Sequence, residues 1–148
     1  MGVTTEMVTT RAGKVEVHHG GDGAPVVYLH SATGEGLGVP FTDALSGSFE
    51  VWAPMFPGFG ESEGIDAIDD MEDAVFHLLD LWDRLELSAP LVVGTSLGAW
   101  LAVELATRYP ERVGRLVLVN PVGLYLPGDE VHDIFGTKPW ELADRLFA

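Results

Sequence analysis

The chain of 148 residues contains no cysteine, which excludes disulfide bonds, thiolate catalysis and cysteine metal ligands. It also has little positive charge: 8 Lys and Arg stand against 23 Asp and Glu, for a formal net charge of −15. Such a surface repels phosphate backbones and anionic lipid heads, so nucleic-acid and membrane partners are not expected.

Long apolar runs are also missing. No run reaches the roughly 18 residues that a membrane-spanning helix needs. The first residues, Met1 to Arg11, lack the basic region followed by an apolar stretch that marks a secretory signal. We therefore expect a cytoplasmic protein.

What is present is enough apolar sequence to build a core, since 47% of the residues are hydrophobic. Residues 15–18 alternate between apolar and polar, which is typical of a half-exposed strand. Four further strands are expected, and most of these segments are short, almost continuous apolar runs typical of strands buried on both faces. They cover residues 25–30, 49–56, 91–93 and 115–120.

Two helices are expected between these strands. Apolar residues at steps of three and four predict the first helix and its buried face, namely Ile68, Met71, Val75, Leu78, Trp82 and Leu85. The second helix begins within residues 94–98 and ends near Tyr109, because Pro110 follows. The alternation predicts an α/β fold with a mostly parallel sheet and helices on both faces, and its functional site should lie at the carboxyl ends of the strands.

The pattern G-x-S-x-G occurs twice, around Ser62 and around Ser96. A serine nucleophile of this kind needs a buried strand that ends at the motif and a helix that begins inside it. The motif around Ser96 meets both conditions, and Gly94 and Gly98 supply the small neighbours that a strained turn requires. Ser62 lies in a loop between two glutamates, whose charges would oppose a developing oxyanion. We therefore predict Ser96 as the nucleophile.

Several segments, in this order and spacing, resemble the α/β-hydrolase superfamily, in particular its serine-nucleophile branch of lid-containing esterases and C–C hydrolases. They are Leu29-His30 with a small-residue loop, Pro57 to Ser62, Val93 to Trp100, and Tyr109 to Val113 leading into Leu116 to Pro121. The resemblance covers residues 10 to 125. It implies that Ser96 is the nucleophile and that the backbone amides of Leu97 and Ala32 form the oxyanion hole. It also implies that His30 supports this loop, although Ser31 stands where the family usually has glycine.

The resemblance also implies that a catalytic acid and a histidine base follow on later strands. Residues 1–125 would then be the N-terminal part of the core, and residues 126–148 the start of a helical lid. His132 and Asp133 are adjacent on this expected helix, so they cannot act together as a relay. We expect an incomplete fold without its C-terminal strands, little activity from residues 1–148 alone, and self-association through an open sheet edge at residues 116–119.

The remaining histidines are expected to play no chemical part. His18 and His19 fall on a surface strand and its turn, and His77 falls on the solvent face of the first helix. No cluster of potential ligands suggests a metal site, and no cofactor is expected.

The leading function is therefore hydrolysis through a serine acyl-enzyme. The substrate would be an ester, lactone, amide or carbon–carbon bond of a small and partly apolar molecule. A non-catalytic receptor or ligand-binding module on the same fold is the alternative. A nucleotide site at Gly34 to Gly38 is disfavoured, because Val39-Pro40 does not resemble the start of a helix that would receive a pyrophosphate.

Overall fold

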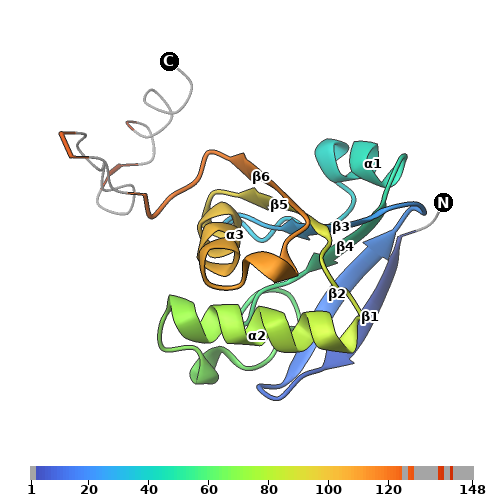
Figure 1. The fold of residues 1–148 in the computed structure, drawn as a ribbon, viewed down its shortest axis with the longest axis horizontal. Helices are drawn as coiled ribbons and strands as arrows, with labels where there is room; N and C mark the ends of the chain where they lie inside the picture. The colour runs from blue at the N-terminus through green and yellow to red at the C-terminus, as the bar shows by residue number, and fades with distance from the viewer. Residues whose placement is uncertain (1–2, 125–126, 129–136, 139–140, 142–148) are drawn as a thin grey trace.

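The computed structural model describes residues 3–124, 127–128, 137–138 and 141. Within them, one sheet has the strand order β1-β2-β4-β3-β5-β6 (Figure 1). The strands are β1 (Thr4–Thr9), β2 (Lys14–Gly20), β3 (Pro25–Leu29), β4 (Glu50–Pro54), β5 (Leu91–Thr95) and β6 (Arg115–Val119). The last four in the order are parallel to one another, whereas β1 and β2 are antiparallel to their neighbours.

Three α-helices and two short 3-10 helices connect the strands. They are α1 (Pro40–Ser46), α2 (Met71–Arg84), α3 (Leu97–Arg108), η1 (Ile65–Ala67) and η2 (Pro110–Arg112). Helix α1 lies on one side of the sheet, and α2 and α3 lie on the other (Figure 1). The predicted α/β architecture, a mostly parallel sheet covered on both faces, is therefore confirmed.

The alternation of side chains along β3 shows how the sheet divides the core into two layers. Val27 and Leu29 join a buried cluster with residues of α2 and α3. Val26 and Tyr28 point to the opposite face and join a second cluster, against which Leu45 of α1 packs. Both faces of β3 are therefore buried, as is typical of a central strand in a parallel sheet.

Helix α2 begins at Met71, after a carboxylate cap. The carboxylate of Asp70 accepts hydrogen bonds from the backbone amides of Glu72 and Asp73, and this caps the first turn. The predicted apolar face is buried at Val75, Leu78 and Trp82. Ile68 was expected on the helix but precedes it, because the cap at Asp70 makes Met71 the first helical residue.

The last strand lies at the open sheet edge expected at residues 116–119, so it is not buried on both faces as its apolar run alone predicted. Within the described residues β6 pairs only with β5, so it is an edge strand. Leu116, Val117 and Leu118 are 36%, 45% and 37% exposed. The run of apolar residues indicated the strand correctly, but exposure depends on a further neighbour that local sequence does not reveal.

Strand β1, helix α1 and the two 3-10 helices were not predicted from the sequence. Strand β1 has few strong apolar residues and is held mainly by pairing with β2. Helix α1 begins at Pro40, although Val39-Pro40 did not resemble the start of a helix that would receive a pyrophosphate; proline suits the first helical turn. The expected lid, including His132 and Asp133, lies largely outside the described residues.

Candidate active site

Ser96 lies at a sharp bend between β5 and α3. Its backbone has φ 51° and ψ −108°, a conformation that residues other than glycine rarely adopt. The Ser96 amide donates to the carbonyl oxygen of Val119 on β6 at 2.9 Å, which anchors the bend. Its side chain does not cap α3 and is only half buried. The strain of this bend, of order 1–3 kcal/mol, is therefore held by the surrounding strands.

Both glycines of the motif are required by close backbone contacts. A Cβ at Gly94 would lie 2.5 Å from the carbonyl oxygen of Gly98 and 2.6 Å from Cα of Ala99. A Cβ at Gly98 would lie 2.2 Å from the carbonyl oxygen of Leu29. The expectation that small residues flank Ser96 thus has a direct steric cause.

The second motif has a different role. The Ser62 hydroxyl donates to the carbonyl oxygen of Met55 and accepts from the amide of Glu16, both at 2.9 Å. These bonds tie the loop after β4 to β2. The Ser62 oxygen is thus part of the scaffold, as its loop position indicates.

The two amides expected to form the oxyanion hole lie on adjoining segments. Leu97 is the first residue of α3, so its amide has no partner within the helix. Ala32 lies in an exposed turn after β3, and its amide has no partner in the part of the chain that the structure describes. The Gly98 amide donates to the His30 carbonyl oxygen at 3.1 Å, which brings the start of α3 against the end of β3.

His30 connects the loops that follow β3 and β4. The imidazole is 1% exposed. Its Nδ1 donates to the carbonyl oxygen of Ser31 at 2.6 Å, and its Nε2 accepts from the amide of Phe56 at 2.9 Å. Burial lowers the pKa of His30 and outweighs the opposing bond to Ser31. His30 is therefore a neutral imidazole whose two nitrogens are both engaged, and it cannot serve as a base for Ser96.

His18 was predicted to be a surface residue, yet it is half buried and well connected. Its Nδ1 accepts from the Leu37 amide at 3.2 Å, and its Nε2 donates to the Glu16 carboxylate at 2.7 Å. The same carboxylate accepts from the amide of Glu61, and this bond is the main reason that the pKa of Glu16 is lowered. Alternation in β2 placed His18 opposite the core, but the loops that cover this face could not be inferred from the strand.

The prediction for His77 was also wrong. It does not face solvent but is 7% exposed, and both ring nitrogens are buried without a hydrogen-bond partner. Burial lowers its pKa, partly opposed by Asp80. The segment from Ile65 to Ile68 folds back beside α2 and covers this side of the helix. Helical periodicity could not have revealed this cover.

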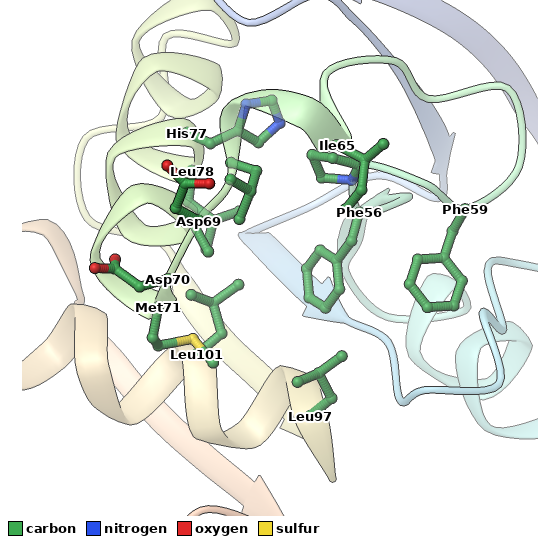
Figure 2. A pocket seen from close by; sticks show the side chains of 13 residues that line it. Phe56, Phe59, Ile65, Asp69, Asp70, Met71, His77, Leu78, Leu97 and Leu101 are labelled. Carbon is green, nitrogen blue, oxygen red and sulfur yellow. The ribbon is translucent and has the colours of Figure 1, made fainter.

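A largely apolar cavity of about 300 Å³ lies next to the bend at Ser96. Leu97, directly after Ser96, lines it together with Leu101 of α3. Figure 2 shows His77 and Leu78 of α2 across from Phe56 and Phe59 in the loop after β4. The cavity thus begins at the residue expected to hold the oxyanion.

Among the described residues, no histidine is hydrogen-bonded to Ser96, and no group of three or more His, Asp or Glu side chains could hold a metal ion. None of the helices in this part of the chain has the length and apolarity to cross a bilayer.

The chain is similar in sequence to curated hydrolases. The chain is 36% identical over 135 residues to 2-hydroxymuconate semialdehyde hydrolase from Pseudomonas sp. (strain CF600), covering 85% of this chain and 47% of that protein. It is also 36% identical over 139 residues to 2-hydroxy-6-oxo-2,4-heptadienoate hydrolase from Pseudomonas putida, covering 86% of this chain and 49% of the relative. The chain therefore spans about half the length of these curated relatives.

A solved structure gives the same fold. Naproxen esterase from Bacillus subtilis superposes with a TM-score of 0.78 at 26% identity, over 85% of this chain and 46% of the esterase. The family model described as the alpha/beta hydrolase fold matches residues 24–143, most of the chain. With its mostly parallel sheet, its bend at Ser96 and these relatives, the chain belongs to the α/β-hydrolase family.

Proposed function

We propose that the protein is a serine hydrolase in which Ser96 is the nucleophile. The main support for this proposal is the strained backbone of Ser96 between β5 and α3. Gly94 and Gly98 lie so close to neighbouring backbone that no Cβ would fit at either position. In the proposed reaction the Ser96 oxygen bonds to a carbonyl carbon, and the serine proton passes to a base. The leaving group then departs with a proton, and water releases the acyl group.

The amides of Ala32 and Leu97 would stabilise the oxyanion of this reaction. Both amides follow the carboxyl ends of neighbouring parallel strands, as Ser96 does. Neither amide has a hydrogen-bond partner within the described residues. Removal of one such donor typically costs about 10²–10³ in kcat, so the position of this loop is expected to matter.

The apolar cavity beside Leu97 indicates that the substrate carries a partly apolar acyl group. Its walls are mainly hydrophobic, and its volume of about 300 Å³ suits a short chain or a small ring. We propose a small ester, lactone, amide or carbon–carbon bond as the substrate, and we propose the cytoplasm as the compartment. The relatives are named as hydrolases of 2-hydroxymuconate semialdehyde and of 2-hydroxy-6-oxo-2,4-heptadienoate, which fits a small oxygenated substrate.

The test is labelling with alkyl fluorophosphonates, in which the serine oxygen bonds to phosphorus, fluoride leaves and the serine proton is released. We would use the longest product that the gene encodes and read the modified residue by mass spectrometry. Labelling should disappear in Ser96→Ala and persist in Ser62→Ala, the matched variant in the other motif. A hexyl probe should react faster than a methyl probe because of the apolar cavity. Absence of labelling in the unaltered protein would favour a ligand-binding module instead.

Residues 1–148 alone should hydrolyse p-nitrophenyl esters slowly. Among the described residues no histidine is hydrogen-bonded to Ser96, and both nitrogens of His30 and of His18 have other partners. A normal turnover number that Ser96→Ala abolishes would contradict this expectation.

A further inference from the structure

The turn that carries Ala32 is closed by a carboxylate. Glu35 lies at the end of this turn, and its two oxygens accept four hydrogen bonds. Oε1 accepts from the Ser31 amide and from the Tyr28 hydroxyl, both at 2.8 Å. Oε2 accepts from the hydroxyls of Ser31 and Thr33, both at 2.7 Å. The carboxylate thus binds the residues on each side of Ala32.

This network reaches both the sheet and the nucleophile. The Tyr28 hydroxyl comes from the buried strand β3 and also lies 3.4 Å from Oγ1 of Thr95, the residue before Ser96. The amide of Gly34 donates to the Ser31 carbonyl oxygen at 3.2 Å, which closes the turn around Ala32. One carboxylate therefore fixes the turn relative to β3 and to the end of β5.

Resting on the proposed function, we propose that Glu35 is a positioning residue that holds the Ala32 amide in place for the oxyanion. Serine at position 31 lacks the conformational range of glycine, but its amide and hydroxyl give Glu35 two of its four bonds. Loss of the carboxylate leaves the Ser31 amide without its partner and releases the turn. Burial raises the pKa of Glu35, but hydrogen bonds from Ser31 and Thr33 outweigh this effect and bring the pKa to about 2. The Glu35 carboxylate is therefore ionised near neutral pH.

A simple charge effect predicts the opposite result, which makes the proposal decisive to test. A carboxylate near an oxyanion repels it, so removal of the charge alone should stabilise an anionic adduct. Under the positioning role, removal of Glu35 should weaken the same adduct. The sign of the change separates the two roles.

The probe is phenylboronic acid, and the protein is the longest product that the gene encodes. The Ser96 oxygen adds to trigonal boron, the serine proton goes to solvent, and the tetrahedral boronate carries the negative charge. We expect Glu35→Ala to weaken binding at least about ten-fold. Glu35→Gln should lie between Glu35→Ala and the unaltered protein, because its oxygen can still accept from the Ser31 amide. The matched control is Glu50→Gln, which removes one charge at the amino end of β4 and should leave binding unchanged.

Amide hydrogen exchange supplies a readout that does not depend on catalysis. Glu35→Ala should speed exchange at Ser31 while the midpoint of urea unfolding changes little. Unchanged exchange at Ser31, or boronate binding that is unchanged or tighter in Glu35→Ala, would overturn the positioning role. If the unaltered protein binds no boronate, Ser96 is not the nucleophile and the proposed function fails. In that case, unchanged exchange at Ser31 in Glu35→Ala also rejects the role of Glu35 in positioning the turn. Faster exchange at Ser31 would show that Glu35 still holds the turn, independently of catalysis.

Discussion

The amide of Gly98 donates to the carbonyl oxygen of His30 at 3.1 Å, so the first turn of α3 rests directly on the end of β3. This contact leaves no room for a side chain at position 98. It brings the helix start and the loop after β3 to the same edge of the sheet. The geometry proposed for the nucleophile and for the oxyanion amides depends on it.

Gly98→Ala should lower the free energy of unfolding by about 3 kcal/mol or more, because its Cβ would meet the Leu29 carbonyl oxygen at 2.2 Å. Gly38→Ala is the matched variant: Gly38 has φ +97° but no atom within 4 Å of its added Cβ. It should cost only about 1 kcal/mol of backbone strain. Urea unfolding followed by circular dichroism measures both, and equal costs would show that the close contact is not what limits position 98.

Ser96→Gly should raise the free energy of unfolding by about 1 kcal/mol. Glycine relieves the strain at φ 51°, and this gain exceeds its greater chain entropy in the unfolded state. Ser96→Ala keeps the strained backbone and should leave the stability nearly unchanged. Urea midpoints of the three proteins provide the measurement. A Ser96→Gly variant less stable than Ser96→Ala would argue that the bend is relaxed.

Stability should fall as the pH is lowered from 8 towards 5.5. The folded pKa values of His30 and His77 lie below the unfolded value of 6.5, so the unfolded state takes up protons first. The stability that these neutral histidines contribute is present above that value and is lost below it. Unfolding free energies measured across this range should show the decrease.

His77→Phe should reduce this acid sensitivity. It also removes two buried nitrogens that lack partners, so at pH 8 it should stabilise the protein by about 1 kcal/mol. The charged groups that line one pocket together with His77, namely Asp73, Asp80 and Arg11, remain in the variant. An unchanged dependence on pH in His77→Phe would assign the effect to His30 or to carboxylates.

Residues 1–148 should self-associate through the exposed edge of β6. The backbone of this strand pairs on one side only within the described residues, and Val117 is 45% exposed. Val117→Lys places a charge on this edge and should weaken association at least about ten-fold, which corresponds to about 1.4 kcal/mol. Sedimentation equilibrium measures the change. The control is Val3→Lys, at a similarly exposed valine that precedes β1 at the opposite end of the strand order. A concentrated sample that remains monomeric would reject this interface.

Sequence reasoning located the bend at Ser96 because three local signals coincide there: a buried strand, small neighbours and an immediate helix. It rejected Ser62 for the same reason, and the structure gives the Ser62 hydroxyl two backbone partners. These features are set by residues close together in the chain, so one sequence is enough to infer them. The roles of the predicted site residues in catalysis remain predictions.

The errors arose where distant segments cover one another. His77 carries the polar character of a solvent-facing helix position, yet it is buried, and residues 65–68 lie beside it. Glu35 was an ordinary residue of a glycine-rich loop until the turn brought Ser31 and Thr33 to its carboxylate. Periodicity describes one element at a time and contains no information on what lies across from it.

The single imidazole of His30 has a practical consequence for protein engineering. It bonds to Ser31 in one loop and to Phe56 in the other, so neither loop has an independent geometry. Grafting only one of these loops from a homologous enzyme would pair it with a second loop whose geometry does not match, because His30 bonds to both. A transplant intended to change selectivity should exchange both segments and retain the ring that joins them.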